Sequence, residues 1–130
     1  MTMAGQNLSQ RFPGKRVFIT GAASGLGLAC AETLAREGWR LILTDVDAPR
    51  LDLVSQSLAR DGAQVAAVAC DVRDAAALRA LVDEAATAYG GIDVAIHAAG
   101  VASIGAFHTS TPEDWAWQFD INVHGVANSC

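Results

Sequence analysis

The chain has 130 residues, of which 52% are hydrophobic and 18% are charged, and its formal net charge is −5. A chain this apolar is not a disordered protein, and its length suffices for one hydrophobic core. The acidic balance and the scattered arginines argue against nucleic acid as a partner. Much of the apolar fraction is alanine, which favours an α/β class with helices packed closely on a sheet.

The N-terminal segment, residues 1–13, is polar and is predicted to be a flexible tail. Residues 1–11 contain neither a basic region nor the apolar stretch of a secretory signal. No apolar run in the chain approaches the roughly 18 residues of a membrane span. We therefore expect a cytoplasmic protein that does not bind membranes.

The cysteines, Cys30, Cys70 and Cys130, are odd in number and far apart in the chain. This spacing indicates neither a disulfide framework nor a metal knuckle. We expect buried spectator thiols and no metal site.

From residue 14 onwards, predicted strands alternate with predicted helices. A glycine-rich turn over 21–27 follows the first strand, and residues 100–110 lack a clear period and are predicted to be a loop. In chain order, the predicted strands are 15–20, 40–45, 64–70 and 92–99, and the predicted helices run from the glycine turn to Gly38, from Pro49 to Asp61, from Asp74 to Gly90, and from Thr111 to the last residue. The first helix carries apolar residues at helical spacing, namely Leu26, Cys30 and Leu34.

This alternation indicates right-handed crossover units and a parallel sheet with helices on both faces. The sequence therefore predicts a Rossmann-like, doubly wound α/β domain over 14–130 with about four strands. Ligands of such folds bind beyond the carboxyl ends of the strands, where the strand order reverses.

The segment from Thr20 to Gly27 (TGAASGLG) lies between a predicted strand and a predicted helix, the context of a phosphate-binding turn. Gly21 would allow a tight turn, Gly25 would let the backbone approach a pyrophosphate, and Gly27 would let the helix pack on the strand. The first amides of the helix would hold the phosphates. A glycine-rich turn without a ligand is the alternative.

The pattern T-G-x-x-x-G-x-G resembles the fingerprint of the classical short-chain dehydrogenase/reductase family. Four further features agree with it: Asp45 closing the second strand, Asp71-Val72 after the third, Ala98-Ala99-Gly100 after the fourth, and Asn122-Val123-His124-Gly125 on the last helix. The resemblance extends from Lys15 to Cys130. It implies that the domain is truncated after about four strands and incomplete at its C-terminal side.

The resemblance implies an oxidoreductase that uses NAD, acts on an alcohol or carbonyl substrate, and is a homo-oligomer in its full-length form. It implies a catalytic role for Asn122, supporting a water-linked proton path. The implied cofactor-binding residues are Gly21, Ser24, Gly25, Leu26, Gly27, Asp45, Asp71, Val72, Ala98, Ala99 and Gly100.

Asp45 favours NAD over NADP. Its carboxylate can accept hydrogen bonds from both ribose hydroxyls of NAD, whereas it would repel the 2′-phosphate of NADP. Neither Ser24 nor Val46, where phosphate-binding relatives often carry a basic residue, supplies a compensating cation. The alternative for Asp45 is a cap of the loop from Asp45 to Asp47.

His97-Ala98 departs from the family pattern, because paired asparagines are typical at these positions. His97 could be a catalytic base or a ligand, but no carboxylate or second histidine stands at ligand spacing. A strand histidine whose ring is satisfied by backbone is the preferred interpretation.

The family's catalytic serine and Tyr-x-x-x-Lys motif have no counterpart in the sequence. The only tyrosine is Tyr89, followed four positions later by Asp93, and the only lysine is Lys15. Both are expected at the end of the sheet away from the cofactor, so this chain alone is expected to be inactive. A non-catalytic nucleotide-binding or interaction module is the alternative function, and a methyltransferase-like Rossmann protein is a weaker third.

Overall fold

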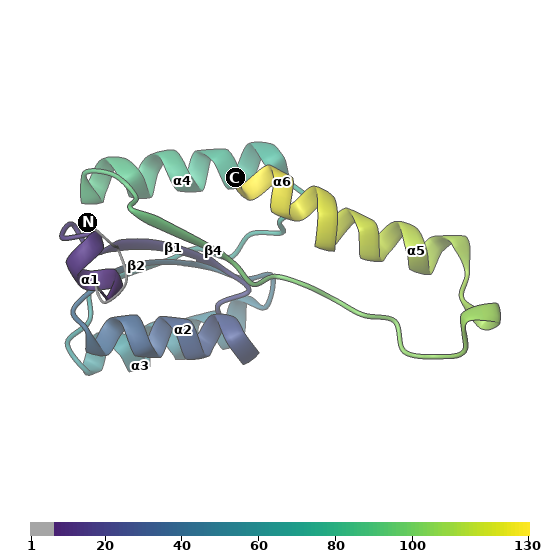
Figure 1. The fold of residues 1–130 in the computed structure, drawn as a ribbon, viewed down its shortest axis with the longest axis horizontal. Helices are drawn as coiled ribbons and strands as arrows, with labels where there is room; N and C mark the ends of the chain where they lie inside the picture. Colours follow the sequence, from purple (N-terminus) through teal and green to yellow (C-terminus); the bar gives the residue numbers. More distant parts are fainter. Residues whose placement is uncertain (1–6) are drawn as a thin grey trace, which may run out of the picture.

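The computed structural model describes residues 7–130, and residues 1–6 of the predicted tail lie outside this range. The described chain is an α/β fold with one parallel sheet (Figure 1). Its strands are β1 (Arg16–Thr20), β2 (Arg40–Thr44), β3 (Val65–Ala67) and β4 (Val94–His97). Its main helices are α2 (Gly25–Arg36), α3 (Ala48–Arg60), α4 (Ala75–Tyr89), α5 (Pro112–Phe119) and α6 (Gly125–Ser129).

The strand order is β3-β2-β1-β4, and every pair is parallel. The chain crosses from β1 to β2 and β3 on one side and then returns to place β4 on the other side of β1. The order therefore reverses between β1 and β4, the position where doubly wound folds bind their ligands. The predicted fold class is confirmed.

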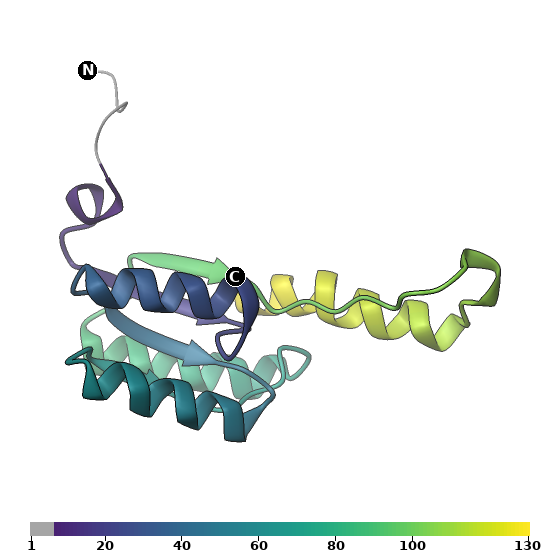
Figure 2. The same cartoon turned by 90° about the horizontal axis from the view of Figure 1, so that it is seen from below.

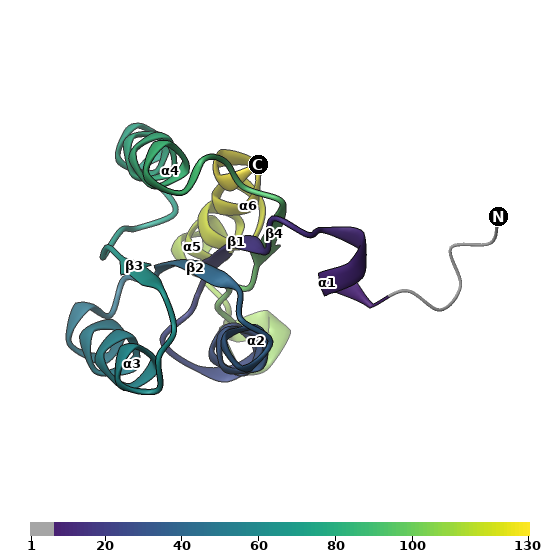
Figure 3. The same ribbon diagram turned by 90° about the vertical axis from the view of Figure 1, so that its left-hand side faces the viewer.

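The core has two layers because alternate residues of the central strands face opposite sides of the sheet. Helices α2 and α3 cover one face, and α4 covers the other (Figure 3). The first layer packs Val17, Ile19, Leu41 and Leu43 against Ala31, Leu34, Leu51 and Leu58, whereas the second packs Phe18 and Ile42 against Leu78, Leu81 and Ala85. Near-continuous apolar strands are typical of a sheet covered on both faces.

The sequence predicts a flexible tail up to residue 13, but its described part contains a short helix, α1 (Leu8–Arg11). Asn7 and Gln10 form a capping box at its start. Ser9 accepts a hydrogen bond from Nε1 of the buried Trp39, at 2.9 Å. The Ser9 hydroxyl also donates to Glu37 Oε2 at 2.7 Å. Local capping and these two polar contacts attach the segment to the domain, and neither has a signal in hydrophobic periodicity.

Strand β3 is shorter than the predicted strand 64–70. After Ala67 the chain stays beside β2, but through isolated hydrogen bonds that do not form a regular ladder. The amide of Val68 donates to Leu43 O, the Thr44 hydroxyl donates to Val68 O, and the amide of Cys70 donates to Asp45 O. The threonine side chain replaces a backbone donor, which ends the regular pairing.

The predicted last helix is interrupted by a π-helical turn, η2 (Asp120–His124), between α5 and α6. Helix α5 and the segment before it, which includes the 3₁₀ turn η1 (Phe107–Thr109), project beyond the sheet (Figures 1 and 2). Single π turns inside α-helices are frequent at functional sites. This π turn contains Asn122, so the helix around Asn122 is a candidate for a functional role.

An ion pair closes the edge of the sheet opposite the carboxyl ends of the strands. Arg16 Nε lies 2.9 Å from Asp93 Oδ2, and Nη2 lies 2.9 Å from Oδ1. The bidentate guanidinium lowers the pKa of Asp93 below its ordinary value. The pair ties the start of β1 to the start of β4.

We predict that Asp93→Asn lowers the stability of the fold at neutral pH. Because the folded-state pKa of Asp93 is depressed, its contribution is fully present above the unfolded value of about 3.9 and is lost as pH falls through the folded value. Urea unfolding at several pH values should therefore show a difference between wild type and variant that is constant near pH 7 and shrinks below about pH 4. A constant difference at every pH would contradict this assignment.

Candidate functional site

A cleft of about 510 Å³ lies at the carboxyl ends of the strands, at the reversal between β1 and β4. All the predicted cofactor-binding residues line it except Gly27. The lining residues are Gly21, Ser24, Gly25, Leu26, Asp45, Val46, Cys70, Asp71, Val72, Arg73, Ala98, Ala99, Gly100, Val101, Trp117 and Ile121. Its volume is within the usual range for ligand sites, about 300–1,000 Å³.

Gly21 and Gly27 bring backbone segments closer together than any side chain would allow. A Cβ on Gly27 would lie 2.1 Å from Gly21 O, and a Cβ on Gly21 would lie 2.6 Å from the amide nitrogen of Ala99. Gly21 also has a φ of 65°, in the left-handed region. Gly27 is thus buried behind the cleft, where it permits the close packing of α2 on the turn.

Helix α2 presents unpaired amides to the cleft. Its N-cap residue Ser24 makes no side-chain capping bond, and the first helical hydrogen bond runs from Leu28 N to Ser24 O. Within the described residues, the amides of Gly25, Leu26 and Gly27 have no hydrogen-bond partner. Free amides and the positive end of a helix dipole are a site for an anion such as a phosphate.

The sequence places Leu26 on the apolar face of this helix, and that assignment is wrong. Its side chain is 81% exposed, whereas Gly27, Ala31 and Leu34 are buried. The buried stripe is displaced by one residue because the helix begins at the rim of the cleft, so Leu26 lies over the opening and not over the sheet.

Asp45 already accepts two backbone hydrogen bonds. Its Oδ2 lies 2.9 Å from the amide nitrogen of Ala23, and its Oδ1 lies 3.0 Å from that of Asp47. The capping alternative for Asp45 is therefore observed, but it leaves the carboxylate lining the cleft. A carboxylate offers about four acceptor positions, so two remain for a ligand. The two amides fix the orientation of the side chain.

The loop after β3 places a second carboxylate at the cleft, paired with Arg73. Arg73 Nη2 lies 2.6 Å from Asp71 Oδ2, and Nε lies 3.0 Å from each carboxylate oxygen. These hydrogen bonds lower the pKa of Asp71. Arg73 therefore neutralises Asp71 and is not a free cation in the cleft.

Val72 connects this loop to the last helix. Its side chain is 7% exposed, and its Cγ2 lies 2.5 Å from where a Cβ on Gly125 would be. Its carbonyl accepts a hydrogen bond from Asn128 Nδ2 at 3.0 Å. Gly125 is therefore needed for this close approach, which explains the glycine of the Asn-x-x-Gly pattern.

Asn122 does not line the cleft, because its side-chain amide is paired with the backbone of Val101. Val101 N donates to Asn122 Oδ1 and Asn122 Nδ2 donates to Val101 O, both at 2.8 Å. The amide thus mimics a strand partner and fixes the chain as it leaves Gly100. The catalytic assignment made from the sequence remains a prediction, while the structure gives Asn122 a positioning contact.

The sequence predicts that backbone groups satisfy the ring of His97, but in the structure the ring contacts two side chains. Its Nδ1 lies 2.7 Å from Ser129 Oγ, and its Nε2 lies 3.6 Å from Cys130 Sγ. Sequence periodicity could not reveal these partners, because they come from the far end of α6.

Tyr89 and Lys15 lie at the opposite end of the sheet from the cleft, as predicted. Tyr89 ends α4, and its carbonyl accepts from Arg40, the first residue of β2. Lys15 precedes β1, and its ammonium donates to Glu37 O at 2.9 Å. Neither side chain can reach a ligand held beyond the carboxyl ends of the strands.

Several lining residues were not predicted. Cys70, Arg73 and Val101 each adjoin a predicted residue, so the motifs locate their segments but do not show which side chains face the cleft. Trp117 and Ile121 come from the projecting helix, and their spacing of i, i+4 places them on one face. That spacing, together with Asn122 beside it, is the signal that could have identified them.

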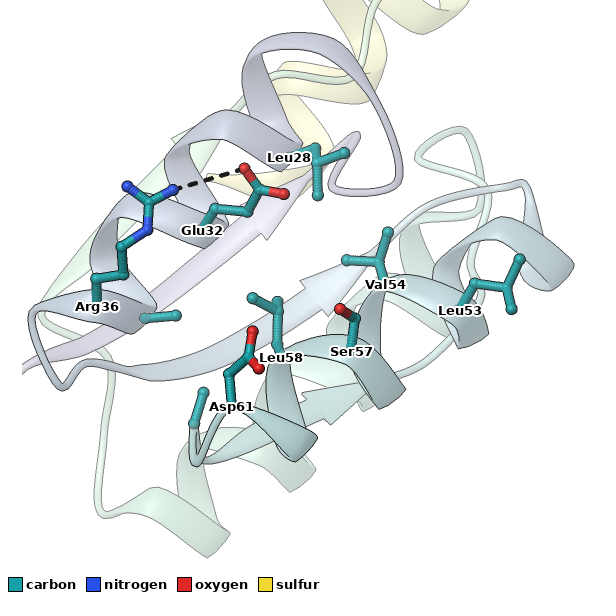
Figure 4. Close-up of a pocket in the computed structure, with 10 residues that line it drawn as sticks. Leu28, Glu32, Arg36, Leu53, Val54, Ser57, Leu58 and Asp61 are labelled. Atoms are coloured by element: carbon teal, nitrogen blue, oxygen red, sulfur yellow. Dashed lines mark ion pairs between the residues drawn. The ribbon is translucent and has the colours of Figure 1, made fainter.

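A second cavity, of about 400 Å³, lies between α2 and α3 (Figure 4). Its lining mixes apolar residues such as Leu28 and Leu58 with polar ones such as Ser57 and Asp61. It also contains one ion pair, between Glu32 and Arg36 at 3.8 Å. None of the predicted cofactor residues lines it. The cleft at the strand ends is therefore the candidate site.

The described residues contain neither a membrane-spanning helix nor a metal-binding cluster. Across residues 7–130, no helix is long and apolar enough to cross a membrane. In the same range, no three residues of the types His, Cys, Asp and Glu lie close enough together to hold a metal ion.

The chain is 38% identical over 116 residues to a 2,3-dihydro-2,3-dihydroxybenzoate dehydrogenase of Bacillus subtilis, covering 89% of this chain and 44% of that protein. It is 35% identical over 120 residues to a D-threitol dehydrogenase of Mycolicibacterium smegmatis, covering 92% and 46% respectively. The chain thus spans less than half the length of these relatives.

Solved structures agree with the sequence relatives. A short chain dehydrogenase/reductase from Burkholderia phymatum in complex with NAD superposes with a TM-score of 0.85 at 42% identity, over 89% of this chain and 41% of that one. A short chain dehydrogenase from Mycobacterium paratuberculosis bound to NAD superposes with a TM-score of 0.85 at 33% identity, and the match covers 89% of this chain and 48% of that one. The family model described as short chain dehydrogenase matches residues 15–130, and the chain therefore belongs to the short-chain dehydrogenase family.

Proposed function

We propose that the chain carries the cofactor-binding part of an NAD-dependent oxidoreductase that acts on an alcohol or carbonyl substrate. The observation that carries this proposal is the arrangement of Asp45 and the unpaired amides of Gly25 and Leu26 around one cleft. The Asp45 carboxylate would bind the ribose diol of NAD, and the neighbouring amides would bind its pyrophosphate. The orientation of both sets of groups is fixed by the fold.

The residues fit the parts of NAD in different ways. The amides at the start of α2 would hold the pyrophosphate, and Asp45 would accept from the hydroxyls of the adenosine ribose. Asp71 and Val72 would border the adenine, and Ala98, Ala99 and Gly100 form the wall on the β4 side. When bound, NAD supplies a nicotinamide that accepts hydride from an alcohol carbon.

The charge of the cleft supports NAD over NADP. Among the described residues 7–130, Arg73 is the one cationic side chain that lines the cleft, and its guanidinium is already held by Asp71. Val46, next to Asp45, is 72% exposed and uncharged. A 2′-phosphate beside Asp45 would therefore face a carboxylate without a free cation, which disfavours NADP.

The substrate class rests on the relatives. Those named above act, by their names, on a dihydrodiol and on D-threitol, both of which carry hydroxyl groups. A hydroxyl-bearing small molecule, or the carbonyl formed from it, is the substrate we propose for the whole enzyme.

We propose further that these 130 residues alone do not transfer hydride. A tyrosine hydroxyl must be tuned by a nearby cation to exchange a proton at neutral pH. In this chain burial raises the pKa of Tyr89, and the residue lies at the wrong end of the sheet. Absorbance at 340 nm with NAD and a panel of polyols should show no turnover, whereas measurable turnover would contradict the proposal.

The second candidate function is a non-catalytic nucleotide-binding module. The position of Tyr89 and Lys15, away from the cleft, favours it. Reading the source gene beyond the codon for Cys130 separates the two candidates. A downstream serine and Tyr-x-x-x-Lys would support the enzyme, and their absence would support the module.

Calorimetric titration of the chain with NAD, ADP-ribose and nicotinamide mononucleotide tests the site itself. Because the described groups face the adenosine and pyrophosphate, NAD and ADP-ribose should both bind at one site, and the mononucleotide should bind far more weakly. Adenosylmethionine lacks the pyrophosphate and should not bind. Failure of both NAD and ADP-ribose to bind, or tight binding of adenosylmethionine, would overturn the proposal.

A further inference from the structure

The hydrogen bonds of Ser129 determine which nitrogen of His97 carries its proton. Ser129 Oγ lies 2.9 Å from Val126 O, to which its hydroxyl donates. A hydroxyl has one proton to donate, so its oxygen must accept from His97 Nδ1 at 2.7 Å. The neutral ring is therefore the Nδ1–H tautomer, and Nε2 is left as an acceptor facing Cys130 Sγ.

His97 ends β4, and the three residues that follow it form one wall of the cleft. The far end of this wall is tied by the two hydrogen bonds between Val101 and Asn122. The near end is tied by the bond between His97 and Ser129. Both ties run to the same continuous helical segment, η2 and α6.

The spacing of the two ties is consistent along both segments. From His97 to Val101 the chain covers about 13 Å if extended, and from Asn122 to Ser129 a helix rises about 10 Å. The segments run antiparallel, because the earlier residue of one contacts the later residue of the other. The wall 98–100 therefore lies along the helix and is held at both ends.

We propose that His97 is a positioning residue which, with Ser129, fixes the wall formed by Ala98, Ala99 and Gly100 in the geometry that the cofactor needs. The wall touches the glycine turn, since a Cβ on Gly21 would lie 2.6 Å from Ala99 N and 2.7 Å from Ala98 O. A shift of the wall therefore moves the phosphate-binding turn as well. His97 itself does not line the cleft. This inference rests on the proposed binding of NAD.

The test compares His97→Ala, His97→Asn, Ser129→Ala and the double alanine variant. Asparagine places an amide donor near the position of Nδ1, so it should keep the hydrogen bond and the affinity of wild type. His97→Ala and Ser129→Ala should each lower the affinity for NAD about five-fold, as expected for the loss of one hydrogen bond. The double variant should bind NAD as tightly as either single variant, because each single substitution already removes the same contact.

Ser55→Ala is the matched control, because the Ser55 hydroxyl also donates to a carbonyl of its own helix, Asp52 O at 3.0 Å, and Ser55 does not line the cleft. It should leave NAD affinity unchanged. Additive losses in the double variant, wild-type affinity in His97→Ala, or failure of His97→Asn to preserve affinity would each overturn the proposal.

Hydrogen exchange distinguishes failure of this inference from failure of the proposed function, because it needs no cofactor. The amides of Ala98 and Ala99 bond to Thr20 O and Thr20 Oγ1. In Ser129→Ala and His97→Ala these amides should exchange about five-fold faster while that of Ile19 in the core is unchanged. Unchanged exchange at Ala98 and Ala99 would overturn the inference even if wild type binds NAD. Faster exchange in the variants, together with no NAD binding in wild type, would support the positioning of the wall by His97 and Ser129 and would overturn the proposed function instead.

Discussion

Gly27→Ala is expected to destabilise the fold by about 3 kcal/mol or more and to remove NAD binding. The new methyl group would lie 2.1 Å from Gly21 O, a backbone atom that can move only if the whole turn moves. Overpacking of this kind costs about 1–3 kcal/mol where side chains can adjust, and backbone contacts adjust less. Urea unfolding followed at equilibrium, with calorimetric titration of NAD, measures both effects.

Gly105→Ala is the matched control for this substitution. Its new Cβ would meet only Thr109 Oγ1 at 3.7 Å, an ordinary van der Waals distance. Its effect on stability should be within about 0.5 kcal/mol, the usual range for surface substitutions. If Gly27→Ala and Gly105→Ala behaved alike, the packing role assigned to Gly27 would be wrong.

The double substitution Asp45→Ala with Val46→Arg is expected to reverse the cofactor preference from NAD to NADP. It removes the acceptor for the ribose hydroxyls and supplies a cation beside the 2′-phosphate. At an effective dielectric near 20 and about 4 Å, each unit-charge interaction is of order 4 kcal/mol before screening. A difference in binding free energy of about 1.4 kcal/mol that remains after screening corresponds to a tenfold ratio of dissociation constants. Dissociation constants for both cofactors at low salt give the ratio.

Asp47→Asn controls for the loss of negative charge. Asp47 is two residues away and does not line the cleft, and its carboxylate caps α3 through Arg50 N at 3.1 Å. This variant should keep the wild-type ratio of NAD to NADP affinity. Equal affinities for the two cofactors in wild type, or an unchanged ratio in Asp45→Ala, would contradict the assignment of Asp45 to the ribose.

The fold could be predicted largely because its signals are local. A buried strand such as β2 and the glycine turn after β1 have a composition that few other structures share. The end of β3 and the π turn at Asp120–His124 could not be predicted, because they depend on contacts with other elements. Thr44 bonding to Val68 O is one such contact.

The positions of the residues around the cleft could be predicted to a similar extent and for a similar reason, while their roles in binding stay a prediction. Strand-end positions such as Asp45 and Gly100 follow from the parallel topology, since all these ends meet at one edge of the sheet. The pairing of Asp71 with Arg73, the two backbone bonds on Asp45, and the contact of His97 with Ser129 follow from side-chain orientations that no pattern specifies. These contacts decide which groups remain available to a ligand.

A crystal structure of this chain grown with NAD tests the central claim most directly. We expect the adenosine ribose hydroxyls within hydrogen-bond distance of the Asp45 carboxylate and the pyrophosphate on the amides of Gly25 and Leu26. NAD bound in the cavity between α2 and α3, or bound at the cleft with its ribose away from Asp45, would contradict the account.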